Sequence, residues 1–432
     1  MPRRPPPAQP PNPFRISGVV TGEHFTDRAD ELRRIEQALL EPGDKLLVFG
    51  RRRMGKSSTL DRAIEHVTER DAVAFRADLA GATTVTDVAN RILQGTSRAL
   101  GRRWQDLLAG FVKALTLRVT LSADPVTGIV LPTLTVEGRL DSLDHQRASL
   151  ERVLDTVEQT AEQRGIRIGV VLDEFQAIHR FGGESAEWHL RSVIERHKHV
   201  SYVAAGSELS LIEAMQGEGR AFYKLFRLLH HGPIEPEHFA RWIDERLAGA
   251  GLEPAGIGAR IVATAGPRTR DVVELARTVY DVASPRGAIA ESTLGDALRE
   301  MLVTNGEPFR RLWEELPPSQ QNVLRAIAAG EPRLYARDSR ERFGFKSTAE
   351  VAQAVEWLAK REVLTVEAKK AEFDNPFFKA WVIERALPDV GILESTADIV
   401  RSLQASPAAS SAAAPAPAPR DASRRPRGKK PG

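Results

Sequence analysis

The sequence contains no cysteine among its 432 residues, which excludes disulfide bonds and zinc sites built on thiolates. It also lacks any apolar run close to the about 20 residues that a membrane-spanning helix requires. The proline-rich start, residues 1–13, has arginines but no apolar segment behind them, so we expect a flexible arm and not a secretory signal. These absences favour a cytoplasmic protein without a membrane partner.

Positive charge is scarce outside the end of the chain. The formal net charge is +3, yet six cations against one aspartate lie in the Ala- and Pro-rich segment 405–432. The rest of the chain is therefore slightly acidic. We expect the segment to be a disordered basic tail. The basic pI is thus no argument that the folded part binds nucleic acid.

Short apolar runs alternate with helical patterns in the first half of the chain. They predict buried strands at residues 46–49, 72–75, 168–175 and 200–207. A long helix is predicted over Leu143–Arg164. Alternation of apolar and polar residues with turn signals predicts a β-hairpin insertion at about 115–140. Strands that alternate with helices favour an α/β fold, in which helices cover both faces of a parallel sheet.

The second half has a different pattern. Helical patterns alone occupy residues 236–305, and a helical stretch followed by two short strands occupies residues 306–388. The latter order is typical of a winged helix-turn-helix domain. We therefore predict five segments: a flexible arm 1–13, an α/β core 14–235, a helical lid 236–305, a winged helix 306–388, and a C-terminal helix with the tail 389–432.

The stretch from Gly50 to Ser57 fits the phosphate-binding pattern G-x-x-x-x-G-K-[ST] and lies between a predicted strand and a predicted helix. Glycines allow the tight turn that points backbone N–H groups at phosphates, and the helix N-terminus adds partial positive charge. The predicted nucleotide-binding residues are Gly50, Arg51, Arg52, Arg53, Met54, Gly55, Lys56, Ser57 and Ser58. Lys56 would reach the β- and γ-phosphates and Ser57 would bind Mg²⁺. The motif therefore predicts a P-loop NTPase.

The apolar strand that begins at Val170 ends in Asp173 and Glu174, which is the pattern of a Walker B motif. Asp173 would hold Mg²⁺, and Glu174 would act as the general base that activates the attacking water. A carboxylate pair at a strand end is common by itself. Because it follows a phosphate loop here, the two motifs together predict hydrolysis of a nucleotide.

Three further residues are candidates for catalytic roles. Ser207 ends a predicted strand, where it would either sense the γ-phosphate or cap a helix at residues 209–215. In the lid, Arg268 or Arg270 would reach the γ-phosphate, or else both would belong to a solvated helix start. We favour Arg270. Arg220 and Arg227 are weaker candidates for arginine fingers that act on a second subunit.

The motif GRRRMGKSS resembles the phosphate loop of the prokaryotic archaeal-type ATPases, in the STAND branch of P-loop NTPases, which are similar to origin-recognition initiators of the AAA+ group. The segment NPFRISGVVTGEHFTDRADELRRIEQAL resembles their lead-in, and VVLDEFQAI resembles their Walker B motif. AGPRTR falls at their Gly-Pro or sensor-2 element, which implies a nucleotide contact for Pro267. DNPFFKAWV resembles the end of their winged helix. The resemblance implies an ATP-driven switch that uses ATP, ADP and Mg²⁺.

The partner of the winged helix stays open at this stage. The predicted recognition helix, Ser347–Lys360, buries a stripe of Val and Leu residues but carries few cations for DNA phosphates. One hypothesis is a DNA-binding regulatory ATPase that uses the winged helix and the basic tail. The other is a signalling or defence ATPase whose winged helix binds a protein client, a second copy or its own core. Arg51, Arg52 and Arg53 would form either a solvated rim or an electropositive collar that draws in nucleotide or meets an acidic edge of a neighbour.

Overall fold

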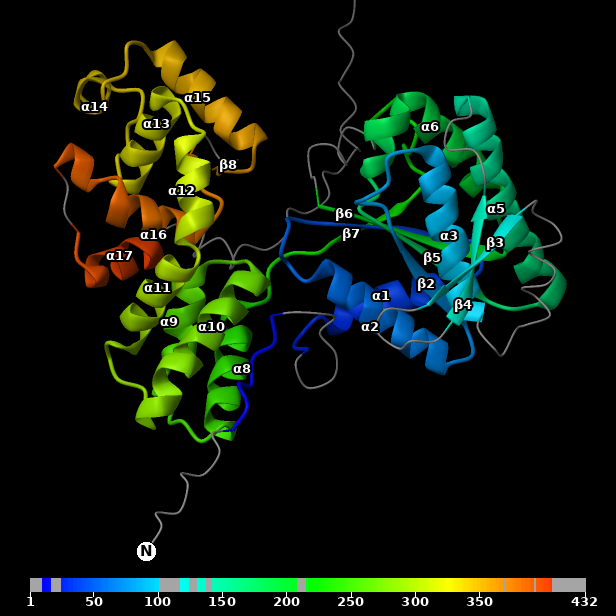
Figure 1. The fold of residues 1–432 in the computed structure, drawn as a ribbon, viewed down its shortest axis with the longest axis horizontal. Helices are drawn as coiled ribbons and strands as arrows, with labels where there is room; N and C mark the ends of the chain where they lie inside the picture. The colour runs from blue at the N-terminus through cyan, green and yellow to red at the C-terminus, as the bar shows by residue number, and fades with distance from the viewer. Residues whose placement is uncertain are drawn as a thin grey trace, which may run out of the picture.

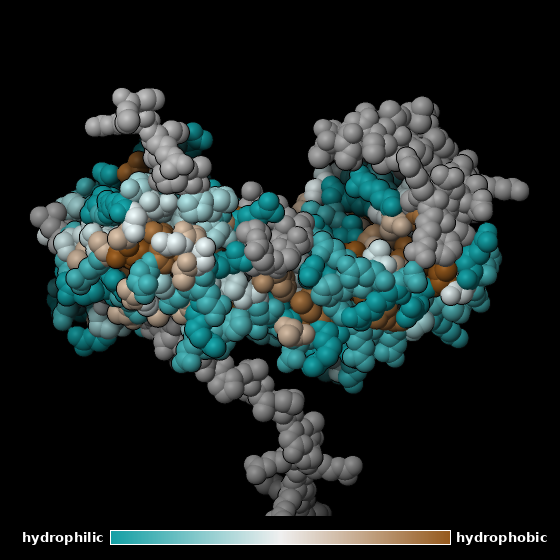
Figure 2. Space-filling model, turned by 90° about the horizontal axis from the view of Figure 1, so that it is seen from below, coloured by the Kyte–Doolittle hydropathy of each residue, from teal (hydrophilic) through white to brown (hydrophobic). Residues whose placement is uncertain are grey.

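The computed structural model describes residues 10–16, 25–100, 117–123, 130–136, 142–207, 215, 217–367, 370–391 and 394–405. They form two lobes, one with a sheet covered by helices and one built almost entirely of helices (Figure 1). Seen from below, the lobes are separate masses with mostly hydrophilic surfaces that meet at a narrower middle (Figure 2). None of the helices in the described ranges is long and apolar enough to cross a membrane.

The sheet has five parallel strands in the order β2-β5-β6-β1-β7. Their bounds are β1 Lys45–Phe49, β2 Val73–Asp78, β5 Ile168–Asp173, β6 Val200–Gly206 and β7 Arg227–His230. The first four confirm the predicted strands, with ends that differ by a few residues. Strand β7 has no counterpart in the prediction, because only Leu229 of this edge strand is buried and it leaves no apolar run in the sequence.

Helices cover both faces of the sheet, as predicted. Their bounds are α1 Ala29–Leu40, α2 Lys56–Glu69, α3 Val85–Leu100, α5 Leu143–Arg164 and α6 Ala177–Arg196. One hydrophobic cluster lies between the sheet and α1 with α2, and a second lies on the opposite face with α3, α5 and α6. Helix α5 has the bounds that the sequence predicts. A sheet buried on both faces explains why its strands are continuous apolar runs.

An antiparallel hairpin is inserted between α3 and α5. Its strands are β3 Leu117–Ala123 and β4 Val130–Val136, and Leu117 pairs with Val136. Both strands lie within the predicted insertion at 115–140, and β4 lies beside α3. The described part of the insertion therefore has the predicted hairpin form.

Four helices form the lid: α8 Pro236–Gly249, α9 Ile257–Ala265, α10 Thr269–Ala283 and α11 Thr293–Thr304. Residues 10–13, part of the arm that the sequence predicts to be flexible, are held on this lid instead. The Tyr280 hydroxyl donates to the Pro10 carbonyl over 2.7 Å, and the Arg277 guanidinium donates to the Phe14 carbonyl over 2.8 Å. Phe14 is fully buried in the lid. Burial of this aromatic ring anchors the segment, which composition alone does not reveal.

The winged helix follows the lid. Its elements are α12 Gly306–Glu314, α13 Pro318–Ala328, α14 Arg337–Phe343, α15 Thr348–Lys360, β8 Leu364–Glu367, β9 Lys370–Phe373 and α16 Pro376–Arg385. Helix α15 is the predicted recognition helix, and its buried residues are the predicted stripe Val351, Ala354, Val355 and Leu358. The chain then returns to the lid through α17, Thr396–Gln404.

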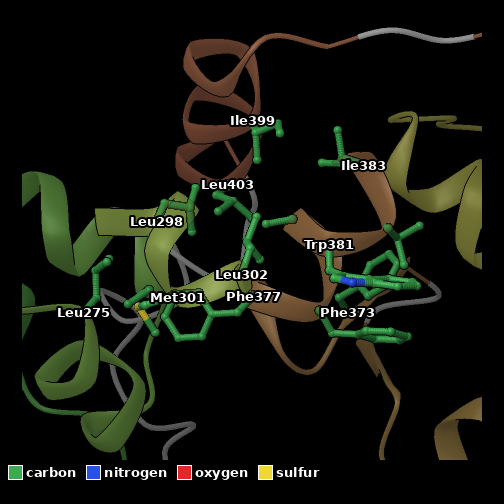
Figure 3. Packing of buried hydrophobic residues seen from close by; sticks show 14 of the residues in the cluster. Leu275, Leu298, Met301, Leu302, Phe373, Phe377, Trp381, Ile383, Ile399 and Leu403 are labelled. Atoms are coloured by element: carbon green, nitrogen blue, oxygen red, sulfur yellow. The ribbon is translucent and has the colours of Figure 1, made fainter. Parts of the chain in front are cut away.

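The lid and the winged helix share one hydrophobic cluster. Figure 3 shows its centre, where Leu298 and Leu302 of α11 lie near Leu403 of α17, and where Phe377 and Trp381 come from α16. Because apolar contacts run without a break between the two regions, they form one packed body. The two predicted domains 236–305 and 306–388 are thus joined by their core as well as by the chain.

Candidate nucleotide site

The predicted phosphate loop lies between β1 and α2, as the motif requires. A Cβ atom at Gly50 would lie only 2.3 Å from the carbonyl oxygen of His231, so no larger residue fits there. Gly55 has a φ of 90° and begins α2, a conformation that favours glycine. His231 is fully buried, and its Nε2 lies 3.0 Å from the Thr59 hydroxyl. Two glycines and a buried histidine therefore fix the loop against the sheet.

Lys56 is buried at the inner side of this loop, with 7% of its surface exposed. Its Nζ donates to the carbonyl of Gly50 over 2.9 Å and to that of Arg51 over 2.8 Å. Burial lowers the pKa of Lys56 to about 8, although the carboxylates of Glu174 and Asp173 act in the opposite direction. The ammonium group thus lies inside the loop whose backbone is shaped for phosphates.

The two predicted metal ligands are brought together from residues that are far apart in the sequence. The Ser57 hydroxyl donates to Oδ2 of Asp173 over 2.9 Å, with Ser57 at the start of α2 and Asp173 at the end of β5. A hydroxyl and a carboxylate are hard oxygen donors of the kind that Mg²⁺ prefers. Within the described residues there is no cluster of three or more His, Asp or Glu side chains suited to a metal ion. Because both are oxygen donors, Ser57 and Asp173 fit a Mg²⁺ ion that would share its coordination with nucleotide phosphates and water.

Glu174 has an unusual backbone, with a φ of 52° for a non-glycine residue. Its carboxylate accepts hydrogen bonds from Nε2 of Gln176 over 2.6 Å and from the Ser207 hydroxyl over 3.0 Å. Ser207 is itself buried at the end of β6. Non-glycine residues with positive φ are concentrated at functional sites, and here the hydrogen bonds fix the direction of the carboxylate. The alternative role of Ser207, a cap for a helix at 209–215, falls mostly outside the described residues.

A cavity of about 390 Å³ opens over these residues, between the sheet lobe and the lid. Its polar lining includes residues of the phosphate loop with Glu174, Ser207 and Arg270. Its apolar lining includes Phe25 and Trp242. The polar groups suit phosphates, and the aromatic side chains suit a flat base.

Two parts of the chain match known domain families. Residues 25–239 match the family described as an ATPase domain predominantly from Archaea, and residues 307–384 match a probable winged helix domain. The chain carries an ATPase domain of this archaeal-type family. No curated protein matches the chain in sequence.

Several solved structures are similar to this chain over most of its length. A Walker-type ATPase of Pyrococcus abyssi is 18% identical with a TM-score of 0.56, over 86% of this chain and 99% of that chain. The Orc1 protein of Aeropyrum pernix in complex with DNA is 16% identical with a TM-score of 0.47, over 87% and 97%. The Orc2 protein of the same organism, in ADPNP and ADP complexes, is 14% identical with a TM-score of 0.45, over 88% and 96%. At 18% identity, the similarity to the Pyrococcus abyssi ATPase shows a shared fold and does not show a shared function.

Sequence reasoning missed two polar residues of the ATPase domain's site. Arg76 of β2 donates from Nη1 to Oδ2 of Asp173 over 2.9 Å and from Nε to Oδ1 of Asp61 over 2.8 Å. Gln176 contacts Glu174, as described above. The signal for Arg76 was an arginine within a buried strand, since Arg76 pairs in register with Val171 of β5. A buried strand of a parallel sheet rarely carries a charge unless a partner is near.

The lid docks on the phosphate loop of the ATPase domain through the start of α10. The backbone N–H of Arg270 donates to the Arg53 carbonyl over 3.1 Å, and the Thr269 hydroxyl donates to the Met54 carbonyl over 3.1 Å. Arg28, which is 4% exposed, donates to the same Met54 carbonyl over 3.2 Å. Loop and lid are thus joined directly by hydrogen bonds.

The two candidate lid arginines differ in position. Arg270 lines the cavity. Arg268 is 6% exposed, pairs with Asp271 over 3.6 Å, and also pairs with Asp374 of the winged helix. Neither Arg268 nor Pro267 is among the described residues that line the cavity. The geometry therefore favours Arg270 for a contact with phosphate and gives Arg268 a role between domains.

The two weaker arginine-finger candidates have partners in their own chain. Arg220 pairs with Glu184 and, over 3.4 Å, with the buried Glu187. Arg227 pairs with Asp44. Their guanidinium groups are thus engaged on the surface of the ATPase domain itself.

Proposed function

We propose that this protein is an ATP-binding and ATP-hydrolysing switch whose nucleotide state sets the position of its winged helix. The observation that carries the proposal is that Lys56, Ser57, Glu174 and Ser207 line one cavity, with Asp173 hydrogen-bonded to Ser57 and Ser207 to Glu174. These side chains come from three separate segments of the chain. Their types match the needs of phosphoryl transfer, in which catalysis consists mainly of positioning and charge stabilisation.

Each residue has a specific role in the proposed reaction. Lys56 stabilises negative charge on the phosphates, and Arg270 from the lid lines the same cavity. Glu174 accepts a proton from the attacking water, while Ser207 and Gln176 orient its carboxylate. Ser57 and Asp173 would hold Mg²⁺, which supplies charge neutralisation at the phosphates when it is bound. Closure of the lid would exclude water from the cavity.

Two substitutions test the enzyme assignment. Lys56→Ala is expected to abolish binding of a fluorescent ATP analogue, because the site loses its buried cation. Glu174→Gln is expected to preserve binding and to lower turnover by about 10²–10⁴-fold, the usual contribution of a general base. Lys198→Ala, at an exposed lysine of the same domain, serves as the control. Normal hydrolysis by Glu174→Gln would show that the base is another residue.

The client of the switch has two candidates from different classes. DNA is one, through the winged helix and the basic tail. The charges on α15 favour the other, a protein partner: Lys360 pairs with Glu356 over 2.7 Å, and Arg361 lies 3.9 Å from Glu315. Cations that are already paired add little to the phosphate contacts that dominate non-specific DNA affinity.

Fluorescence anisotropy of labelled duplex DNA separates the two clients. We would compare ATP with ADP across a salt series, using the full chain and a chain that ends at Ala405. Binding that survives removal of the tail and differs between nucleotides would establish a DNA-acting switch with a steep salt slope. Binding that disappears with the tail, or that is absent throughout, would assign the winged helix to a protein partner.

A further inference from the structure

Two of the three arginines of the phosphate loop face carboxylates of the other lobe. Nε of Arg52 lies 3.5 Å from Oε2 of Glu362, and Nη1 of Arg53 lies 3.4 Å from Oδ1 of Asp271. Burial lowers the pKa of Arg51, and the charge of Glu372 acts against that shift. The positions of Arg52 and Arg53 favour the interpretation of this motif as a collar that meets acidic residues.

The carboxylates on the winged-helix side gather at the base of its two-stranded wing. Leu364, the first residue of β8, pairs with Phe373, the last residue of β9. Glu362 precedes that pair and Asp374 follows it, so both lie at the end of the wing that is opposite its tip. The backbone N–H of Asp374 donates to the carbonyl of Val363 over 3.0 Å, which closes this end. The acidic wing base is thus a defined surface made of Glu362, Glu372 and Asp374.

Arg268 ties the lid to the same surface. Its guanidinium pairs with Asp374 of the wing base and with Asp271 of α10, and Asp271 in turn pairs with Arg53 of the phosphate loop. Asp271 is 1% exposed, so this chain of charges passes through a desolvated region. The loop, the lid and the wing base therefore share one network of ion pairs.

We propose that Arg52 and Glu362, supported by Arg53, Asp271, Arg268 and Asp374, form an ionic latch that nucleotide phosphates weaken. The proposal rests on the function proposed above. Arg52 and Arg53 line the nucleotide cavity as well as facing the carboxylates. A triphosphate carries more negative charge than one carboxylate, so its binding draws these guanidinium groups away from the wing base.

The strength of the latch suits a switch. The Arg52 and Glu362 side chains are 53% and 44% exposed, and ion pairs between exposed side chains are weak. Salt screens it further. Because coupling between two sites is reciprocal, a latch that ATP weakens must also oppose the binding of ATP.

The absence of cysteine makes the latch directly measurable. Cysteines introduced at two exposed residues, Glu69 of α2 and Ala349 of α15, are the only thiols in the chain and accept spin labels. Pulsed electron spin resonance then reports the distance between the ATPase domain and the winged helix. Without nucleotide we expect one short distance, which lengthens with ATP and with added salt.

Glu362→Lys tests the latch without altering a residue that lines the cavity. The new lysine would adopt the same positive φ of 55° as Glu362, so the backbone strain is the same in the variant and in the wild type. We expect the labels to separate without nucleotide, and an ATP affinity about fivefold tighter, the lower end of usual coupling. Glu341→Lys is the control, since Glu341 is 64% exposed and forms a local i,i+4 pair with Arg337. It is expected to change neither quantity.

The outcomes separate the latch from the proposed function. An unchanged label distance in Glu362→Lys, or an ATP affinity that stays equal or falls, overturns the latch. Recovery of the short distance in the charge swap Arg52→Glu with Glu362→Arg supports it. If wild type binds no ATP and behaves like Lys56→Ala, the proposed function fails, while the label distance without nucleotide still decides whether the contact exists.

Discussion

In the ATPase domain the sheet separates two hydrophobic clusters, whereas in the other lobe a single cluster runs from the lid helices to α17. The ATPase domain is a rigid platform, since its loops project from a sheet that is packed on both faces. Among the described residues, no sheet divides the hydrophobic core that the lid and the winged helix share. A movement of α10 at the phosphate loop is therefore passed to the winged helix without a hinge between them.

This difference indicates where movement is expected, namely at the surface where the two lobes meet. The described contacts between the lobes include hydrogen bonds from the lid to loop carbonyls and ion pairs of loop arginines. Polar contacts exchange readily with water and phosphate, and buried apolar clusters do not. Nucleotide binding is thus expected to alter the boundary between the lobes and to leave the interior of each lobe unchanged.

The largest effect is expected from truncating one core side chain in each lobe. Leu302→Ala removes a buried side chain where α11 meets α16 and α17, and Leu93→Ala removes one under α3. Each is expected to cost about 2–5 kcal/mol of unfolding free energy. Amide hydrogen exchange should quicken throughout the lid and winged helix in the first variant and only in the ATPase domain in the second. If Leu302→Ala loosens the lid but spares the winged helix, they are separate bodies.

The next test concerns the arginines at the start of α10. Arg268→Ala should lower the unfolding free energy by about 2–3 kcal/mol, because it leaves the buried Asp271 and the partly buried Asp374 short of a partner. Arg270→Ala should cost little stability and should weaken ATP binding, because Arg270 lines the cavity. Chemical denaturation and titration with an ATP analogue measure the two effects. Equal stability losses in the two variants would contradict the assignment.

A third test concerns the phosphate loop of the ATPase domain. Gly50→Ala places a Cβ atom against the His231 carbonyl. The resulting distortion of the loop should weaken nucleotide binding by about 1–3 kcal/mol, which is a roughly 5- to 150-fold lower affinity. Gly249→Ala in the lid is the matched control, because a Cβ atom there would meet nothing within 4 Å. It should leave affinity unchanged. Normal nucleotide binding by Gly50→Ala would mean that the loop shifts freely.

The smallest expected effect is on metal dependence. Arg76→Lys keeps the charge but cannot bridge Asp61 and Asp173 as the guanidinium does, so Asp173 is less well oriented. The Mg²⁺ concentration for half-maximal binding of an ATP analogue should rise about tenfold. Arg62→Lys, which alters a local pair with Glu65 on α2, should not change it. An unchanged Mg²⁺ requirement would restrict Arg76 to a structural role.

The sequence predicted correctly those features that depend on residues close together in the chain. The phosphate loop, the recognition helix predicted over Ser347–Lys360 and the helix Leu143–Arg164 are patterns of neighbours, so spacing alone reveals them. Strand β7 was missed because an edge strand needs only one buried residue. Arg76 and Gln176 were missed because each acquires its role from a partner on another element.

The sequence by itself determined the fold class, the order of most elements and the position of the phosphate loop between a strand and a helix, because helix and strand periods and glycine turns are local properties. Only the tertiary structure decided the partners of long side chains. It separated Arg270 at the cavity from Arg268 at the wing base, and it paired Arg52 with Glu362 across about 310 residues of chain. Charge pairs over such separations depend on how whole lobes pack, and no spacing rule encodes that.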